Sequence, residues 1–333
     1  MALKLIEGFE VIPANMLGCK WAVASLTAPV TYTRDHSPNT NALRMVGSEL
    51  TSFDLGDATT LITGFAFMWS GIPDTTVVFQ YMHGPDPQVD LRFNPTTKHF
   101  QINCGNTVIG TGTSTVPENT WVYVEFKAVL GDPNGAVVLR VNETVDINIP
   151  SVRTTQGASA YNTIRFVAVN AGVWQLDDIY VLDTTGATNN DFLGAMRVEG
   201  LAVNHEGDFG QWTVSGSWAM LNWQAVTALD TNRVMTTQLG AQDTYGVSRP
   251  RLATTSIAGM MLHVVGRNQD ANQRYICPLI RIGNTDYGDH SRPFTTHQSL
   301  QLVSKIVEKN PATNTPWVAS DFAEIEVGMR LTE

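Results

Sequence analysis

Aspartates are concentrated in one segment that could carry acid chemistry. The stretch from residue 177 to 183 reads Asp-Asp-Ile-Tyr-Val-Leu-Asp and is otherwise apolar enough to form a strand. Because successive side chains of a strand face opposite sides, Asp177 and Asp183 should share one face and Asp178 the other, with Tyr180 and Leu182. This split separates the adjacent carboxylates. We therefore interpret Asp177 and Asp178 as acceptors that fix neighbouring loops.

Another acid, Glu125, is the only acidic residue on its predicted strand, residues 121–130. Glycoside hydrolysis requires two carboxyl groups on either side of the scissile bond. No second acid alternates with Glu125, and no serine stands in a context that supplies a base. We assign no catalytic residue, and we predict that the chain is not an enzyme.

Oxygen ligands for a hard cation gather at the end of the aspartate segment and just after it. Asp183, Asn189 and Asp191 lie in a polar stretch that contains glycine, and their side chains suit calcium. In the alternative interpretation, these residues bond their own backbone, as Asx residues do in turns. The three cysteines and seven histidines show no paired spacing for a metal, and we expect no cofactor.

Tryptophan is abundant in the second half of the chain, where Trp212 and Trp218 flank a run of small and polar residues. Exposed indole rings form flat, partly apolar platforms for sugar rings. These two residues are our candidates for carbohydrate binding. The alternative is that they pack in a core, since tryptophan buries a large area wherever it can.

The composition restricts the partners. A formal net charge of −10 repels phosphate backbones, so nucleic acid is not expected as a partner. No apolar stretch reaches the length of a membrane helix, and the first residues lack the apolar core of an export signal, so we expect neither membrane insertion nor secretion.

Short apolar runs broken by turn residues predict an all-β protein. On the strand 121–130, Val122, Val124 and Phe126 alternate with polar or amphipathic residues, which indicates a half-buried antiparallel strand. The Gly-Asp-Pro-Asn-Gly turn at 131–135 then leads into a second apolar strand, which predicts a hairpin.

The length of the chain and the turn residues between its apolar runs predict two β-sandwich or jelly-roll domains in tandem, residues 1–185 and 186–333. The two domains are expected to join in the polar stretch 183–191. One short helix is expected near the C-terminus. Ser320 would cap it, and Asp321, Glu324 and Glu326 would lie within it.

Two resemblances add to this pattern. Trp121-Val-Tyr-Val-Glu-Phe, the Asp132-Pro-Asn-Gly turn and Val138-Leu-Arg-Val-Asn resemble concanavalin A-like, or laminin-G-like, jelly rolls. A second set of motifs, in the same order, resembles structural proteins of tailed bacteriophages: Asp177-Asp-Ile-Tyr-Val-Leu-Asp, Asn190-Asp-Phe-Leu-Gly, Arg197-Val-Glu, Trp223-Gln-Ala-Val and Asn310-Pro-Ala-Thr.

The phage resemblance implies a virion component such as a tail appendage, fibre, collar or head-decoration protein, made in the host bacterial cytoplasm. We expect it to act without catalysis, by forming a trimer or higher ring and docking onto other virion proteins. The alternative is a lectin-like, receptor-binding module that recognises bacterial surface glycan.

Overall fold

The computed structural model describes residues 2–12, 14–25, 31–33, 41–168, 172–215, 220–227, 232–251, 256–269, 273–288, 292–294 and 300–332. The chain forms two compact units, residues 1–200 and 201–333. The division therefore follows Gly200 instead of residue 185, because residues 186–200 belong to the first unit. The fold is all-β, as predicted.

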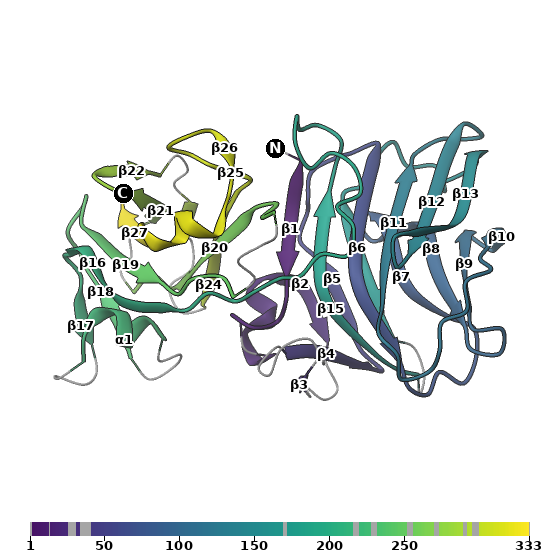
Figure 1. The fold of residues 1–333 in the computed structure, drawn as a ribbon, viewed down its shortest axis with the longest axis horizontal. Coiled ribbons are helices and arrows are strands. Elements are labelled where there is room, and N and C mark those ends of the chain that lie inside the picture. Colours follow the sequence, from purple (N-terminus) through teal and green to yellow (C-terminus); the bar gives the residue numbers. More distant parts are fainter. Residues whose placement is uncertain are drawn as a thin grey trace. The chain divides into compact units, whose positions relative to one another are not determined.

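The first unit contains two antiparallel sheets, which we name sheet A and sheet B (Figure 1). Sheet A has eight strands, in the spatial order β13 (Thr144–Val152), β12 (Gly135–Val141), β11 (Val122–Val129), β6 (Thr60–Trp69), β15 (Val173–Leu182), β4 (Asn41–Val46) and β3 (Thr31–Thr33), with β1 (Leu3–Glu7) also paired to β15. Sheet B has seven strands, in the order β10 (Thr107–Thr111), β9 (His99–Cys104), β8 (Asp86–Asn94), β7 (Thr76–His83), β14 (Thr163–Val167), β5 (Glu49–Ser52) and β2 (Trp21–Ser25). A 3-10 helix, η1, covers Ala14–Cys19.

Aromatic side chains from both sheets meet in the core of the first unit. Phe166 of sheet B packs edge-on against Phe65 of sheet A, with ring centroids 5.1 Å apart. Phe100 likewise packs against Phe67 at 5.4 Å. Such pairs stabilise beyond the area that they bury. They also fix which face of each strand points inward, so the residues between them point outward.

Strand β11 and the predicted hairpin can be compared directly with the structure. The hairpin is confirmed, since β11 pairs with β12 from Val124 to Val129. The prediction that β11 is half-buried is wrong, because Tyr123 and Glu125 on its outward face are 3% and 0% exposed. Residues 191–199 of the same chain cover this face.

The predicted facing of the aspartate segment is also wrong. The pairing of β15 with β6 shifts register between Asp177 and Tyr180, and Asp178 adopts a positive φ of 49°. This bulge inserts one residue into the alternation. Asp177, Tyr180 and Leu182 consequently share the outward face of sheet A.

The second unit is built on a six-stranded sheet of β16 (Val203–Gly210), β19 (Gln242–Val247), β27 (Ile325–Leu331), β21 (Arg274–Ile282) and β22 (Thr285–Tyr287), with β23 (Arg292–Phe294) also paired to β21. Three two-stranded ribbons accompany it: β17 (Thr213–Ser215) with β18 (Arg233–Met235), β20 (Met260–Gly266) with β24 (Gln301–Val307), and β25 (Lys309–Asn310) with β26 (Thr315–Pro316). The helices are α1 (Asn222–Thr227) and the 3-10 helix η2 (Ala319–Ala323).

The helix expected near the C-terminus is this single 3-10 turn, so the prediction is right in place but wrong in extent. Glu324 lies beyond the turn and Glu326 belongs to β27. The acceptor at its start is Asp321, whose Oδ2 receives the Val318 N–H at 3.0 Å, and not Ser320. Among the described residues, no helix is long and apolar enough to cross a membrane.

Candidate functional site

The outward face of sheet A is covered by residues 191–199, which we name the strap. The strap is held through its backbone: Gly194 N–H donates to Glu125 Oε1 at 2.8 Å, and Val198 N–H donates to Asp178 Oδ1 at 2.8 Å. Ala195 N–H donates to Glu143 Oε1 at 3.2 Å. Hydrogen bonds with an ionised acceptor are about twice as strong as neutral ones. The carboxylates of sheet A therefore bind the chain itself.

Glu125 is the centre of this arrangement. Its Oε1 also accepts the Tyr180 hydroxyl, and its Oε2 lies 3.1 Å from Arg140 Nη1. Burial, with the nearby Tyr123 and Glu125, raises the pKa of Tyr180 well above its usual range. The Arg140 guanidinium lies 5.0 Å from the ring centroid of Phe192, a strap residue. Oε1 of Glu125 therefore holds the strap directly, whereas Oε2 forms only the ion pair with Arg140, whose guanidinium lies against the strap.

The three residues predicted to bind calcium lie in the first unit, at the start of the strap and before it. Asp183 Oδ2 forms an ion pair with Lys4 at 2.8 Å. Burial acts to raise the pKa of Asp183, but hydrogen bonds from Lys4 and Thr185 bring it below the ordinary value. Asp191 pairs instead with Lys127 at 3.1 Å, and Asn189 occupies a turn with φ of 55°.

These separate partners favour the alternative in which the acids hold the local structure. Within the described part of the chain, no group of three or more His, Cys, Asp or Glu side chains could hold a metal ion. Calcium binding by Asp183, Asn189 and Asp191 stays a prediction.

Of the two tryptophans predicted to bind sugar, Trp218 lies outside the described residues. Trp212 is half-buried and packs against the second unit's core, which includes Tyr245 and Met329. Its indole Nε1–H donates to the carbonyl of Ala241 at 3.2 Å. The structure therefore places Trp212 at the edge of a core instead of on an exposed platform.

Buried Asp243 fixes this region. Its carboxylate accepts the Tyr245 hydroxyl at 2.6 Å, Asn222 Nδ2 at 2.8 Å and the backbone N–H of Trp212 at 3.1 Å. Burial raises the pKa of Asp243 above its ordinary value. All of these donors belong to the chain, so Asp243 links β19 to the segment that carries Trp212 and α1.

The outward face of sheet B is different, because polar side chains form one row across it. The strand registers pair Thr51 with Arg165, Arg165 with Gln80, Gln80 with Asp90, and Asp90 with Asn103. Directly opposed residues of neighbouring strands lie on the same face. These side chains therefore form a continuous line over β5, β14, β7, β8 and β9, which we name the polar row.

Side-chain hydrogen bonds connect the row. Arg165 Nε donates to Gln80 Oε1 at 2.6 Å, and Gln80 Nε2 donates to Asp90 Oδ1 at 2.6 Å. Next to the row, Arg92 Nη2 donates to Asp90 Oδ2 at 3.0 Å, and Thr51 donates to Glu49 at 2.9 Å. We name the row together with its neighbours Glu49, Arg92 and Gln101 the polar face.

The network on the polar face is incomplete at one end. Asn103 is 3% exposed, and its Oδ1 is buried and has no hydrogen-bond partner among the described residues. Arg92 Nε is likewise buried and unpartnered. Because Asp90 opposes Asn103 and Arg92 lies two residues along the same strand, this acceptor and this donor are diagonal neighbours. Buried polar atoms without partners cost free energy, and they are rare in native proteins.

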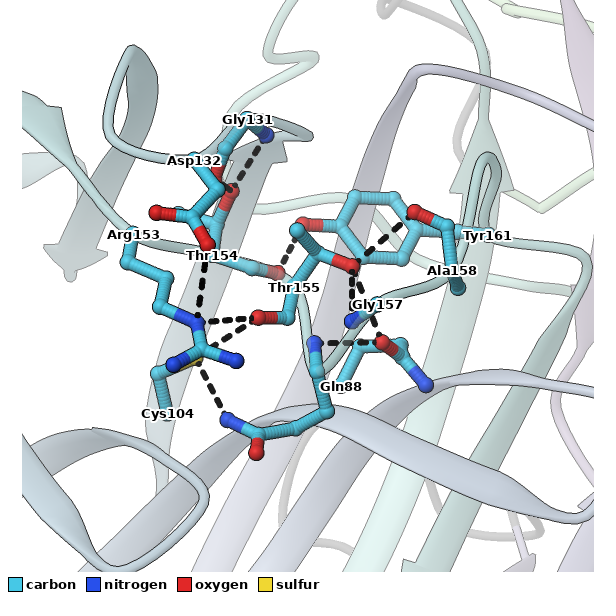
Figure 2. A network of polar contacts seen from close by, with 11 residues as sticks. Gln88, Cys104, Gly131, Asp132, Arg153, Thr154, Thr155, Gly157, Ala158 and Tyr161 are labelled. Atoms are coloured by element: carbon cyan, nitrogen blue, oxygen red, sulfur yellow. Dashed lines mark hydrogen bonds and ion pairs between the residues drawn. The ribbon is translucent and has the colours of Figure 1, made fainter.

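Figure 2 shows a second network, which includes Gln88 of β8 and Cys104 of β9, the residue after Asn103. Gln88 Oε1 accepts the Thr155 hydroxyl at 3.1 Å and the backbone N–H of Gln156 at 2.7 Å. Gln156 Nε2 donates to Cys104 Sγ at 3.1 Å, and Arg153 Nε donates to the carbonyl of Thr155 at 2.7 Å. Burial raises the pKa of the Cys104 thiol. These contacts hold the loop after β13 against strands β8 and β9.

The sequence carries a signal for the polar row, although none of the site residues predicted from the sequence belongs to it. Single polar residues stand between large apolar ones, as in Phe79-Gln-Tyr and Ile164-Arg-Phe. Because successive side chains of a strand point to opposite faces, the polar side chain points outward when its two apolar neighbours point into the core. The row itself depends on strand order, which the spacing of residues does not reveal.

Comparison with known protein families and with curated proteins finds no match. Among solved structures, an endo-β-1,4-glucuronan lyase from Trichoderma reesei is 15% identical with a TM-score of 0.39, covering 49% of this chain and 91% of that chain. Alginate lyase Aly36B is 10% identical with a TM-score of 0.39, covering 54% and 96%.

Domain 4 of AbnA, an extracellular arabinanase from Geobacillus stearothermophilus, is 15% identical with a TM-score of 0.39, covering 55% of this chain and 93% of that one. At these values the similarity assigns no substrate or reaction. The prediction that the chain is not an enzyme is nevertheless contradicted, because polysaccharide lyases stand among the similar structures. The β-sandwich on its own gives no ground for excluding catalysis.

Proposed function

We propose that this protein binds a glycan chain along the polar face of sheet B. The observation that carries the proposal is the polar row, with an unpartnered acceptor on Asn103 and an unpartnered donor on Arg92 at one end. A sugar hydroxyl both donates and accepts, so it can satisfy atoms of both kinds. A row across several strands also suits an extended ligand with repeating hydroxyl groups.

Side chains of the polar row are held in place by hydrogen bonds, and this order supports glycan binding. Gln80 and Asp90 are nearly buried, and their amide and carboxylate groups are held by hydrogen bonds to neighbouring strands. Side chains that are already held in place lose little conformational freedom when a ligand binds. Arg92 and Arg165 keep 29% and 25% of their side chains exposed, so part of the face can meet a ligand.

The setting that we propose is a tailed-phage particle, in which the chain is a structural component that forms a trimer or higher ring. The resemblance to phage structural proteins supports this setting, and its most specific segment, residues 177–199, runs from the second half of β15 to the end of the strap. Several copies in a ring would convert weak single contacts with surface glycan into strong overall binding.

Titration of the full-length protein with glycans tests the binding proposal. Candidate glycans come from an array, and affinities are measured by calorimetry. Arg92→Met and Arg165→Met should each weaken binding at least about tenfold, since a hydrogen bond from a charged group contributes about 1.5–3 kcal/mol. The matched control is Arg330→Met in the second unit, because Arg330 has the same side-chain exposure as Arg92, 29%, and is also paired with an aspartate.

Two outcomes would overturn the proposal: no glycan binds, or binding survives both substitutions on the polar face. Loss of binding on Trp212→Ala but not on Arg92→Met would place recognition in the second unit. The proposed self-association in a phage particle is tested separately. Sedimentation at micromolar concentration should show a trimer or larger ring, and a monomer at every concentration would contradict self-association.

A further inference from the structure

The charges of the polar face restrict the kind of glycan that it can hold. Its charged members are Glu49, Asp90, Arg92 and Arg165, two acids and two bases. Arg92 is paired with Asp90 at 3.0 Å, and Arg165 lies 3.8 Å from Glu49. Each guanidinium therefore already has a carboxylate beside it. We infer that this face selects uncharged glycans over anionic ones, an inference that rests on the proposed glycan binding.

The unpartnered acceptor gives the first reason. Asn103 Oδ1 needs a donor, and a hydroxyl group supplies one. An ionised carboxylate placed at this position only accepts, so it would leave Asn103 unsatisfied, unlike a hydroxyl group at the same position. Asp90, which lies directly opposite Asn103, would in addition repel a ligand anion brought to this position.

The state of Arg92 gives the second reason. Arginine recognises carboxylates best with two parallel N–H groups. Nη2 donates to Asp90 Oδ2 at 3.0 Å and to the carbonyl of Gly105 at 3.5 Å, so neither edge of the guanidinium that includes Nη2 has two N–H groups left, and Nε has no partner among the described residues. A single N–H suits one hydroxyl or ether oxygen. The net charge of −10 on the whole chain adds a long-range penalty for a polyanion.

Matched glycans provide the experiment. Pairs of hexasaccharides with the same linkage and ring stereochemistry, one built of hexose and one of the corresponding hexuronate, are titrated into the full-length protein. In each pair that binds, the neutral member should bind at least about tenfold more tightly, and raising the salt concentration from 0.05 to 0.5 M should leave its affinity unchanged, since screening weakens only charged interactions.

A charge-neutralising substitution sharpens the experiment. Asp90→Asn frees Arg92, so affinity for the uronate member should rise several-fold and become sensitive to salt. The matched control is Asp286→Asn in the second unit, which removes an aspartate that pairs with Arg281 and Arg330 and should change neither affinity.

The outcomes separate the two ideas. If no member of any pair binds, the proposed function itself fails. If glycans bind but the uronate member binds as well as the hexose member or better, glycan binding stands and the selectivity for uncharged chains is overturned.

Discussion

The two outward faces of the first unit begin from the same kind of strand and reach opposite states. Sheet A presents Glu125 and Tyr180, and the strap covers both. Sheet B presents Gln80, Asp90 and Arg165, which bond to one another across strands. On sheet A the carboxylates receive backbone N–H groups of the strap, whereas on sheet B the polar side chains bond mainly to one another, with one bond from Arg92 to the carbonyl of Gly105.

This difference shows how a face is closed or kept open for binding. A loop whose N–H groups meet buried carboxylates is ordered by charge-assisted hydrogen bonds, and it turns an outward face into an inner one. A face whose polar side chains form hydrogen bonds with one another across neighbouring strands needs no covering segment to supply partners. The unpartnered atoms of Asn103 and Arg92 mark the place where lateral satisfaction is incomplete.

Removal of the carboxylate beneath the strap should give the largest effect. Glu125→Ala leaves Arg140 and the Gly194 N–H without their buried partner, and the first unit should lose about 3–5 kcal/mol of stability. Hydrogen exchange of peptides from β11 and β15, followed over a urea series, measures this loss.

The matched control is Glu143→Ala, which removes an exposed acceptor of the same strap. It should cost less than about 1 kcal/mol, because its hydrogen bond is made at the surface. Equal losses in the two variants would show that Glu125 does not anchor the strap.

The next largest effect should come from crowding the covered face. A Cβ added at Gly64 would lie 2.2 Å from the Tyr180 ring, whose hydroxyl is held by Glu125. Gly64→Ala should therefore destabilise the unit by about 1–3 kcal/mol through overpacking. Thermal denaturation checks this, with Gly18→Ala as the control, since a Cβ at Gly18 meets nothing within 4 Å. A neutral Gly64→Ala variant would mean that Tyr180 is free to move away from β6.

Sequence patterns predicted the strands well and the covering of sheet A poorly. The alternation on β11 and the turn at 131–135 are local, and the structure confirms both the strand and the hairpin. The strap depends on pairs far apart in the chain, such as Gly194 with Glu125, which no periodicity reveals. The bulge at Asp178 is a backbone feature that a run of mixed polar and apolar residues does not disclose.

The polar row shows a different limit. Each strand displays its own signal, a single polar residue between apolar neighbours, as at Gln80 and Arg165. The line across the sheet arises because β14 inserts between β5 and β7, although these strands are separated in sequence. Non-local strand order is set by packing of the whole sandwich, so the row could not be assembled from spacing alone.

An effect that is smaller for each pH unit, at most about 1.4 kcal/mol, should appear at the C-terminal end of the strap. Glu10 lies there against Val198 and Gly200, and both of its carboxyl oxygens are buried with no hydrogen-bond partner in the part of the chain that the structure describes. Burial, reinforced by Asp177, raises the pKa of Glu10 from 4.5 to about 9. Unlike Glu125, this carboxyl group receives no strap N–H in the described structure.

Because the folded state holds this proton more tightly than the unfolded state, its contribution to stability is complete below about pH 4.5 and is lost as the pH rises towards 9. The free energy of unfolding should fall across this window with a slope of at most about 1.4 kcal/mol per pH unit. Glu10→Gln should remove the slope, as measured by urea unfolding at several pH values, whereas Glu118→Gln, at an exposed position, should leave it in place. A slope that persists in Glu10→Gln would assign it to another group.

The smallest change in stability should come from the face that we propose to be open. Arg92→Met removes a partly exposed ion pair with Asp90, and such pairs contribute about 0–1 kcal/mol. The variant should unfold within about 1 kcal/mol of the parent in the same exchange experiment, and yet lose glycan affinity. Stability and binding should thus separate on sheet B, whereas on sheet A substitution of Glu125 acts on stability first. If Arg92→Met instead destabilised the unit as much as Glu125→Ala, the polar row would be a stabilising network of the fold, and the contrast between the two faces would disappear.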